Sequence, residues 1–556
     1  MPDRHTLFQE NHIHSTFSDG TSTLEEIFEY NLLHDQFDLV ITDHVNKDTD
    51  WFPKYVDEIQ TLRKKYPQFT VRIGCEVKIL EDGSLNTRED ILNACDVVVG
   101  SVHHFPGIKT MSPEELLEKE FELTKMLAQH AAIDVLGHPF SMSMRFHKKE
   151  PPAQYVEAVY ALCAQHNILF ECSARYGRGT IRELVERELA QGNAGNFSFG
   201  SDAHSVDAIG NAAFTFVQPI SVLVTGAGAG IGQSILKALA LSKVRTRVVA
   251  ADMNPLSAGL YRAAAAYTIP AAHDAAYIPE LKRICTEENI EMLLIGTDTE
   301  LPVLAEHAAS FQKDTGTHIV VSSADAVAIA DDKWKTHEFL QAHGFPHIKS
   351  ALPDAVDVLN KETSFPLAIK PRIGARSIGF QIIQSEEDLQ AALAESNDIV
   401  VQEYLPEDDE EYTCGALFIA GKCYGVIPMK RWLRDGDTYK AIARHDPDLE
   451  KYIEQVGLAL GAEGPCCFQL RKSDGQYKML EINCRFSGTT GAASALGFNV
   501  VNALLQHRFL QRDLYLLMWR EAHIFRYWNE VIVPPESIAD MQKGHTENLQ
   551  GELNIM

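Results

Sequence analysis

The chain has 556 residues, too many for a single hydrophobic core, and this length predicts three or four domains. Hydrophobic residues make up 45% of the chain and charged residues 23%, which excludes intrinsic disorder as a class. The 50 Lys and Arg residues against 77 Asp and Glu residues leave a net charge of −27, which opposes non-specific binding to nucleic acid.

Targeting signals are not evident in the sequence. No apolar run approaches the roughly 18 residues that a membrane span needs, and the start of the chain lacks the apolar core of a signal peptide. The ten cysteines include no CxxC pair, which indicates reduced thiols. We therefore expect a cytoplasmic protein without a membrane partner.

The first part of the chain, up to residue 217, consists of short apolar runs that end in polar clusters. These runs are LVITDH, VRIGCEV, VVVGSVHH, DVLGHPF, ILFECS and FSFGSDAH. Helical patterns lie between them, and one of these begins with a Ser-x-x-Glu capping signal at Ser112. Strands that alternate with helices predict parallel α/β structure such as a barrel, with polar groups gathered at the strand ends.

Histidines and carboxylates recur at these predicted strand ends. His12 and His14 are two residues apart in a strand-like stretch, so both imidazoles face the same side. Asp202 and His204 repeat that spacing. Imidazole and carboxylate together suit Zn, Mn or Fe, and nine such groups exceed the needs of one ion. The pattern predicts a site for two or three divalent metals, with either His103 or His104 as one ligand.

The HxH, TDH, GxE, GSVH, GHP and SDAH motifs, in this order over residues 5–215, resemble the PHP (polymerase and histidinol phosphatase) family. The resemblance implies a distorted α/β barrel with a trinuclear metal centre that hydrolyses phosphate monoesters or cleaves nucleic-acid ends. It also implies catalytic roles for Asp202 and His204. The ligands it implies are His12, His14, Asp19, His44, Glu76, His103, His138, Asp202 and His204. Three arginines that follow predicted strands are candidates for phosphate binding, namely Arg145, Arg175 and Arg178.

A glycine-rich turn, VLVTGAGAGIG, opens the next part of the chain. Its glycines fit TGxxxGxG, which resembles short-chain dehydrogenases, and Asp252 lies where an NAD ribose would be bound. The chain has no Tyr-x-x-x-Lys pair for proton transfer, however. We expect a structural α/β unit here, and an NAD-dependent oxidoreductase is the weaker alternative.

The segment FPLAIKPRIGARSIGF predicts a strand that delivers Lys370, followed by a loop of small residues through Gly374, Ser377 and Gly379. This is not a Walker A loop, but it fits a glycine loop that covers nucleotide phosphates. Further on, an Asp-Gly hairpin signal joins two strands. The first carries Gln469, and the second presents Glu481 and Asn483 on one face with Arg485 continuing it. Such oxygen ligands beside an arginine predict Mg²⁺ on a triphosphate.

Residues 220–505 resemble the ATP-grasp superfamily, nearest to the carbamoyl-phosphate-synthase-like carboxylate–amine ligases. The resemblance implies ATP and Mg²⁺ as cofactors, and a Rossmann-like pre-ATP-grasp domain that holds no dinucleotide. It places Lys333, Lys370, Ser377 and Gly379 at the phosphates and Glu403, Tyr404 and Leu405 at the adenine. It places Glu411, with Glu410 as the alternative, at the ribose. It makes Gln469, Glu481 and Asn483 the Mg²⁺ ligands, and Lys370 and Arg485 catalytic, with Arg485 on the acyl-phosphate.

The predicted fold class is α/β multidomain: a PHP barrel, a Rossmann-like domain and an α+β ATP-grasp domain. The predicted boundaries are 1–217, 218–330 and 331–505, with a tail at 506–556 that completes the last domain. We expect a metal-dependent phosphoesterase fused to an ATP-dependent ligase, with a small carboxylate, an amine and a phosphate ester as substrates. An exonuclease-like PHP domain and a scaffold with decayed sites are the alternatives. The sequence leaves open whether the chain forms a homo-oligomer.

Overall fold

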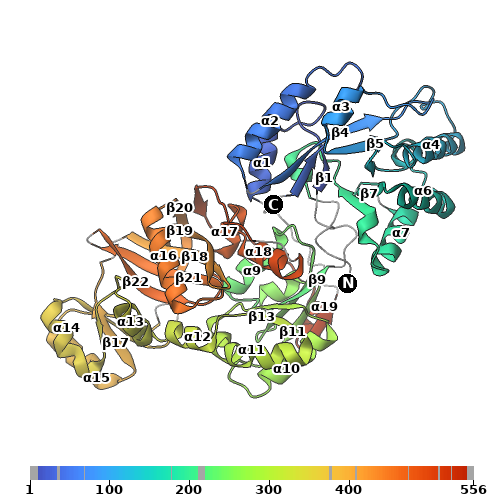
Figure 1. Cartoon of the computed structure of the whole chain (residues 1–556). Helices are drawn as coiled ribbons and strands as arrows, with labels where there is room; N and C mark the ends of the chain where they lie inside the picture. The colour runs from blue at the N-terminus through green and yellow to red at the C-terminus, as the bar shows by residue number, and fades with distance from the viewer. Residues whose placement is uncertain are drawn as a thin grey trace. The chain divides into compact units, whose positions relative to one another are not determined.

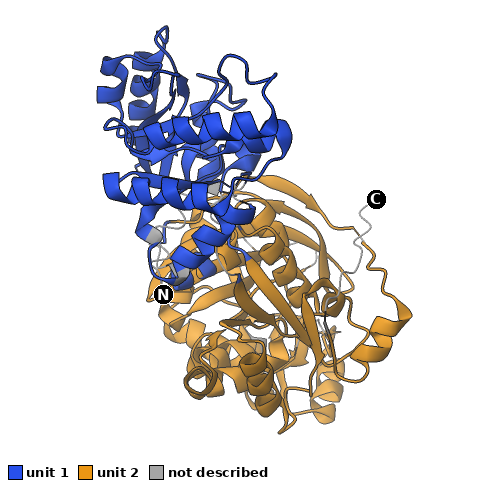
Figure 2. Ribbon diagram, turned by 90° about the vertical axis from the view of Figure 1, so that its right-hand side faces the viewer, with its two compact units in different colours: residues 1–219, 243–245, 505–515 blue, residues 220–242, 246–504, 516–556 orange. Residues whose placement is uncertain are grey.

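The computed structural model describes residues 10–33, 38–67, 69–173, 175–176, 178–210, 219–374, 378–406, 410–473, 475–510, 514–527 and 529–547. The chain divides into two compact units (Figure 2). The first comprises residues 1–219, 243–245 and 505–515, and the second comprises residues 220–242, 246–504 and 516–556. Within the described ranges, no helix is long and apolar enough to cross a bilayer.

The first unit is built on a parallel sheet that nearly closes into a barrel. Its strands follow the order of the chain: β1 (Glu10–Ile13), β2 (Asp38–Ile41), β4 (Thr70–Lys78), β5 (Val97–Ser101), β6 (Val135–Leu136), β7 (Leu169–Ser173) and β8 (Phe197–Gly200), with β3 (His44–Val45) paired to β4. The His14 amide donates to Ala203 O at 2.8 Å, and the Ala203 amide donates to His12 O at 3.2 Å. These bonds join the first strand to the segment after the last.

Helices connect these strands (Figure 1). They are α1 (Leu24–Leu33), α2 (Phe52–Lys65), α3 (Glu89–Ala94), α4 (Pro113–Leu127), α5 (Ser141–His147), α6 (Ala153–His166) and α7 (Gly179–Ala190), with short 3-10 turns at η2 (Ala194–Asn196) and η3 (Val206–Ala208). The capping box predicted at Ser112 is present, because its side chain accepts from the Glu115 amide and its amide donates to the Glu115 carboxylate. Since the strands are parallel, their carboxyl ends meet on one edge of the sheet.

The second unit begins with a Rossmann-like sheet of order β13-β12-β9-β10-β11-β24. Five strands are parallel, β9 (Ile220–Val224), β10 (Thr246–Asp252), β11 (Ala265–Thr268), β12 (Met292–Leu294) and β13 (His318–Val320), and β24 (His545–Glu547) is antiparallel at the edge. Its helices are α9 (Gly230–Ala240), α10 (Tyr277–Glu287), α11 (Leu301–Thr315) and α12 (Ala324–Asp331), with 3-10 turns η4 (Ala258–Arg262) and η5 (Asp298–Glu300). The strand order reverses between β9 and β12, and ligands bind at such switch points in open α/β sheets.

Two glycines let the loops after β9 and β12 approach each other. Gly226 has φ +53°, and a Cβ there would lie 2.9 Å from Thr297 Cγ2. A Cβ on Gly296 would lie 2.2 Å from Thr225 O. The glycine turn is therefore held directly against the segment that carries Asp298.

Two antiparallel sheets complete the second unit. A four-stranded sheet has the order β14-β17-β15-β16, with β14 (Ser350–Ala351), β15 (Leu367–Pro371), β16 (Gln381–Ile383) and β17 (Ile399–Glu403). A six-stranded sheet has the order β22-β21-β18-β19-β20-β23, with β18 (Glu410–Ile419), β19 (Lys422–Arg434), β20 (Asp437–Ala443), β21 (Gly464–Ser473), β22 (Gln476–Asn483) and β23 (Ala522–Phe525). The helices are α13 (Lys333–Ala342), α14 (Val356–Glu362), α15 (Glu386–Glu395), α16 (Pro447–Leu460), α17 (Thr490–Ala495), α18 (Val500–Leu510) and α19 (Pro535–Met541), with η6 (Pro353–Ala355).

The apolar core of the second unit is shared. Core residues of the Rossmann-like sheet, such as Leu293, and of the six-stranded sheet, such as Phe468, belong to one buried cluster, whereas the four-stranded sheet has a smaller core around Leu367 and Val401. The predicted fold class, α/β multidomain with an N-terminal barrel, is confirmed. The hairpin predicted between Gln469 and Glu481 is present as β21 paired with β22.

A buried carboxyl in this core gives a prediction about stability. Burial raises the pKa of Glu300 from 4.5 to about 7, and Thr225 Oγ1 donates to it at 2.6 Å. Because the folded pKa lies above the unfolded value, the stability that the bound proton contributes is complete below about pH 4.5 and is lost as the pH rises towards 7. Glu300→Gln should therefore unfold with a free energy about 1–3 kcal/mol higher than wild type at pH 8, and the gain should shrink towards pH 5.

Urea denaturation at several pH values measures this difference. Glu306→Gln, at an exposed position of α11, is the matched control and should show no such trend. A constant difference between Glu300→Gln and wild type from pH 5 to pH 8 would contradict the prediction.

Candidate active sites

Glu76, at the carboxyl end of β4, is surrounded by five imidazoles in the first unit. Its fully buried carboxylate lies 2.9 Å from His44 Nδ1, 2.9 Å from His138 Nε2 and 3.1 Å from His103 Nε2. His12 Nε2 and His14 Nε2 lie 3.3 and 3.4 Å away. The loops and strand ends that carry these side chains converge because parallel strands end on the same edge.

Three more of the predicted ligands lie against this group. Asp202 Oδ1 is 3.3 Å from His14 Nε2. Asp19 Oδ2 is 3.3 Å from His204 Nε2 and 3.5 Å from His44 Nε2. The structure thus brings all nine predicted ligands together in four overlapping groups, each with ligand atoms within 4.8 Å of one another. Those groups contain His103, whereas the His104 ring packs on Phe146.

The donor set fits divalent cations. Within this cluster, four buried atoms make no hydrogen bond to the described residues: His12 Nε2, His14 Nδ1, His14 Nε2 and Glu76 Oε2. Burial by itself would raise the pKa of Glu76, but the imidazoles, His103 first, hold it well below its usual range. Unpaired buried nitrogen atoms beside an ionised carboxylate are costly unless a cation binds them, so these residues form a site that can hold metal ions.

Glu171 is a component of this site that was not predicted. Its Oε1 lies 2.7 Å from His12 Nδ1, and its Oε2 accepts from the His138 amide at 2.5 Å. A Cβ on Gly200 would lie 2.3 Å from Glu171 Oε1, so glycine is required there. A carboxylate behind a metal-binding imidazole fixes its tautomer and orientation. The run ILFECS, a strand ending in polar residues, carried the same signal as the other strand ends.

A cavity of about 900 Å³ opens next to this cluster. Lys78, Arg145, Arg175 and Tyr176 line it together with the predicted metal ligands. Arg178 is not among its lining residues. Basic side chains that line a cavity together with carboxylates and imidazoles are suited to a phosphate ester.

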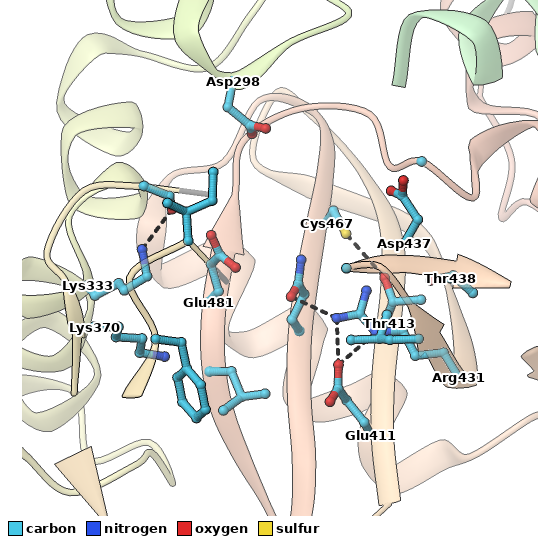
Figure 3. Close-up of a pocket in the computed structure, with 18 of the residues that line it drawn as sticks. Asp298, Lys333, Lys370, Glu411, Thr413, Arg431, Asp437, Thr438, Cys467 and Glu481 are labelled. Atoms are coloured by element: carbon cyan, nitrogen blue, oxygen red, sulfur yellow. Dashed lines mark hydrogen bonds and ion pairs between the residues drawn. The ribbon is translucent and has the colours of Figure 1, made fainter. Parts of the chain in front are cut away.

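A second cavity, of about 580 Å³, lies in the second unit (Figure 3). Nine of the residues predicted for the nucleotide site line it, namely Lys333, Lys370, Glu403, Tyr404, Leu405, Glu411, Gln469, Glu481 and Arg485. Gly379 lies just after the lining residue Ile378, while Ser377 lies outside the described residues. Asn483 does not line this cavity; its Oδ1 accepts from Arg485 Nη2 at 3.1 Å.

Lysines and carboxylates face each other across this cavity. Figure 3 shows Lys333 and Lys370 on one side of Glu481, and Glu411 and Arg431 on the other. Burial lowers the pKa of Lys370 from 10.5 to about 8, with Glu481 partly opposing the shift. Lys333 Nζ donates to Gly374 O at 2.9 Å, within the glycine loop. Neither lysine forms an ion pair with a carboxylate of the described residues, and two such cations in one cavity are suited to polyphosphate.

Glu411, predicted to contact the ribose, and Glu403, predicted to contact the adenine, make ion pairs within the protein. Glu411 lies 2.7 Å from Arg431 Nη2 and 2.9 Å from Arg471 Nη2. Glu403 lies 3.0 Å from Lys478 Nζ and also accepts from the Lys349 amide. Glu410 pairs with Lys430 at 2.6 Å and does not line the cavity. These ion pairs fix the orientation of the Glu403 and Glu411 side chains before a ligand binds.

Several residues that line this cavity were not predicted. Asp298 lies 2.6 Å from Arg485 Nε, and Asp437, Thr413 and Arg526 also contribute. Arg526 reaches the cavity from the segment after β23, which pairs with β20. No local motif marks these residues, because sheet and loop packing alone brings them to the site.

Asp252 holds the glycine turn instead of projecting into a nucleotide site. It accepts from the Gly228 amide at 2.8 Å, the Asn254 amide at 2.9 Å and Ser257 Oγ at 2.9 Å. Both carboxylate oxygens are occupied, so the structural interpretation of this unit accounts for Asp252 without a dinucleotide.

Comparisons with known protein families agree with this geometry. Residues 10–175 match the PHP domain, residues 222–320 match the PylC-like N-terminal domain, and residues 395–525 match the family described as ATP-grasp in the biosynthetic pathway with Ter operon. The chain is a PHP domain joined to an ATP-grasp unit.

Individual relatives of the PHP domain and the ATP-grasp unit are distant. The chain is 29% identical over 204 residues to the DNA polymerase/3'-5' exonuclease PolX of Bacillus subtilis, which covers 35% of this chain and 34% of that protein. It is 26% identical over 193 residues to a D-alanine–D-alanine ligase of a Thermotoga species, covering 30% and 61%. The matched part of the chain thus spans about a third of the length of PolX and about three fifths of the length of the D-alanine–D-alanine ligase. The crystal structure of N5-carboxyaminoimidazole ribonucleotide synthetase from Thermus thermophilus matches with 16% identity and a TM-score of 0.43, covering 57% of this chain and 85% of that one.

The position of Glu171 in the PHP domain gives a prediction about metal binding. Glu171→Gln leaves one oxygen for two donors, so His12 or the His138 amide loses its acceptor. We expect affinity for Mn²⁺ to fall about tenfold or more, as for other residues that orient metal-binding histidines. Isothermal titration calorimetry of the metal-stripped protein measures this affinity.

Glu157→Gln provides the matched control, since Glu157 pairs with Arg187 at an exposed position of α6. This variant should bind Mn²⁺ like wild type. Unchanged Mn²⁺ affinity in folded Glu171→Gln would show that Glu171 does not position the ligands.

The partly buried Lys370 of the ATP-grasp unit gives a prediction about pH. Below about pH 8 the side chain is protonated and can bind phosphate, whereas above that pH it loses its charge. ADP affinity should therefore fall as the pH rises through 8, and binding at pH 8.5 should take up a proton. Calorimetry in two buffers of different ionisation enthalpy detects that proton.

Lys370→Arg keeps its charge across this range, so its ADP affinity should vary less between pH 7 and pH 9. Equal pH dependence in Lys370→Arg and wild type would rule out Lys370 as the titrating group.

Proposed function

We propose that this chain is a bifunctional enzyme in which a PHP phosphoesterase is fused to an ATP-dependent, ADP-forming carboxylate–amine ligase. The observation that supports the ligase most strongly is the convergence of Lys333, Lys370, Glu481 and Arg485 on one cavity from separate elements of the ATP-grasp unit. The proposed substrates are a small carboxylic acid, an amine and a phosphate ester.

The ligase reaction assigns a task to each group. Lys333 and Lys370 hold the phosphates of ATP, and Glu481 and Gln469 offer oxygen atoms to Mg²⁺, which when bound neutralises charge on the triphosphate. Arg485, largely buried, holds the carboxylate and then the acyl-phosphate. The carboxylate oxygen attacks the terminal phosphorus and ADP leaves. The amine then attacks the carbonyl carbon, the bond to phosphate breaks, and the nitrogen gives up its protons to phosphate and solvent.

Asn483 is proposed to bind Mg²⁺ only after its hydrogen bond with Arg485 has broken. Its Oδ1 accepts from Arg485, and its buried Nδ2 has no partner among the described residues. When Arg485 binds a substrate carboxylate instead, the Asn483 oxygen becomes available to the cation. Glu411 is proposed to meet the ribose from within its pair with Arg431 and Arg471.

The PHP site is proposed to hydrolyse a phosphate monoester. Divalent metals held by the nine ligands would supply a hydroxide near neutral pH. Arg145 and Arg175 line the same cavity and are proposed to hold the phosphate of the substrate. Asp202 and His204, at the edge of the cluster, face the cavity and are proposed to act on the reacting groups.

Exonuclease-like activity is the second candidate for this site. The PolX relative, named as a 3'-5' exonuclease, favours it, whereas the net charge of −27 opposes binding to a nucleic-acid backbone. Hydrolysis of p-nitrophenyl phosphate and of a labelled single-stranded DNA, both with Mn²⁺, distinguishes the two. The phosphoesterase proposal predicts turnover of the monoester alone.

ADP release tests the ligase. Wild-type protein with ATP, Mg²⁺ and pooled amino acids, carboxylic acids and amines should release ADP only when the pool is present. Lys370→Ala should lose this activity by about a hundredfold or more, because a charge on the phosphates is removed. His12→Ala should keep it, since His12 belongs to the PHP domain. Failure of every pool to promote ADP release would count against a ligase.

A further inference from the structure

Asp298 makes an ion pair at the point where the carboxylate substrate is proposed to bind. Its Oδ1 lies 2.6 Å from Arg485 Nε, and both residues line the 580 Å³ cavity. The Asp298 side chain is 28% exposed and that of Arg485 10%. The other Arg485 donors are also used, since Nη1 donates to Phe486 O and Nη2 to Asn483 Oδ1. The Arg485 guanidinium is thus paired with a carboxylate of the protein itself, that of Asp298.

Each of the other carboxylates that line this cavity has a cation, a helix end or a proposed metal ion beside it. Glu403 pairs with Lys478, and Glu411 pairs with Arg431 and Arg471. Glu481 is assigned to Mg²⁺ in the proposed ligase. Asp437 is the first residue of β20, and its Oδ1 would lie 3.9 Å from a Cβ on Gly230, the first residue of α9, so the helix dipole offsets its charge.

Asp298 is therefore the carboxylate that loses its partner during turnover. When the substrate carboxylate or acyl-phosphate binds Arg485, the negative charge of Asp298 is left within the cavity, because Arg485 is the one cation among the described residues with which it forms an ion pair. A partly buried, unpaired carboxylate is unfavourable, so this state favours the arrival of a new cation. The second substrate of a carboxylate–amine ligase is a base that is protonated at neutral pH, and it supplies that charge.

We propose that Asp298 binds the ammonium group of the amine substrate, and that it does so only after the first substrate has displaced it from Arg485. This inference rests on the proposed ligase function and adds the class of nucleophile, a primary amine that arrives as a cation. It also adds an order of binding, with the amine last. Asp298 then holds the nitrogen beside the acyl group that Arg485 holds.

The position of Asp298 in the fold agrees with this role. It follows β12 at the switch point of the Rossmann-like sheet, where the loops after β9 and β12 meet. Thr297 and Thr299 flank it and also line the cavity, which adds two hydroxyl groups for hydrogen bonds to a small polar ligand. The close approach of Gly226 to Thr297 holds this segment in place.

The test compares a neutral with a cationic nucleophile. Wild type and Asp298→Asn are supplied at pH 7 with ATP, Mg²⁺ and, one at a time, the amino acids and carboxylic acids of the pool that tests the ligase. The nucleophile is either hydroxylamine, which is uncharged at this pH, or a cation, namely ammonium chloride or an amino acid amide. In Asp298→Asn we expect KM for the accepted cationic amine to rise about tenfold or more, because a charge-assisted contact is lost. Turnover with hydroxylamine should change less than about twofold, and KM for the carboxylate should not rise.

Two further variants complete the design. Asp298→Glu keeps the charge and should recover part of the affinity for the amine. Asp314→Asn removes a carboxylate from a surface pair with Lys282 in the same Rossmann-like domain and should behave like wild type.

The outcomes separate this inference from the ligase proposal. If no acid supports ADP release with hydroxylamine, the ligase is overturned and this inference with it. If hydroxylamine is used and every cationic amine is rejected, only the inference is overturned. It is overturned in the same way if KM for the amine is equal in Asp298→Asn and wild type, or if both nucleophiles are impaired alike.

Discussion

The buried carboxylate of Glu76 organises the PHP site. Five imidazoles approach it within 3.4 Å, and its Oε2 and three ring nitrogens of His12 and His14 have no hydrogen-bond partner among the described residues. Such a cluster is unfavourable for a protein by itself, because burial removes water without supplying partners. The surrounding fold maintains it, through Glu171 behind His12 and a glycine at position 200 that leaves room for that carboxylate. The site is thus preorganised for cations.

The ATP-grasp unit also contains a charged group at its site, but here the group is a cation, and it lacks an ion-pair partner among the described residues. Lys370 is a partly buried cation whose pKa falls to about 8, and it lines a cavity that polyphosphate can fill. In the same cavity Glu411 is paired with two arginines and Glu403 with a lysine, so the charges of these two carboxylates are balanced before a ligand binds. The pair between Asp298 and Arg485 differs, because the proposed reaction requires Arg485 to turn to a substrate. This difference makes Asp298 a candidate for substrate selection.

Much of this arrangement could be predicted from local sequence patterns. The predicted metal ligands follow short apolar strands, and parallel strands bring their ends to one edge, so the sequence order of His12, His44, Glu76 and His138 was sufficient to predict their convergence. The same holds for Gln469 and Glu481, which face each other across one hairpin.

The remaining features depend on contacts that no local pattern encodes. Asp298 and Arg485 lie far apart in sequence and meet because the Rossmann-like sheet packs against the six-stranded sheet around one core. Arg526 lines the cavity because it follows β23, which pairs with β20 at the edge of the six-stranded sheet. The pairing of Glu411 with Arg431 and Arg471 was likewise not evident, since it links three neighbouring strands.

Both sites are built around a charge, buried at Glu76 and partly buried at Lys370, that we propose binds a partner of opposite sign. Anomalous X-ray diffraction from crystals grown with Mn²⁺ and Mg-ADP tests it most directly. The account predicts anomalous peaks about 2.0–2.3 Å from ligand atoms of His12, His14 and Glu76, and ADP with its phosphates at Lys333 and Lys370. Absence of a metal peak at Glu76, or ADP bound away from Lys370, would contradict it.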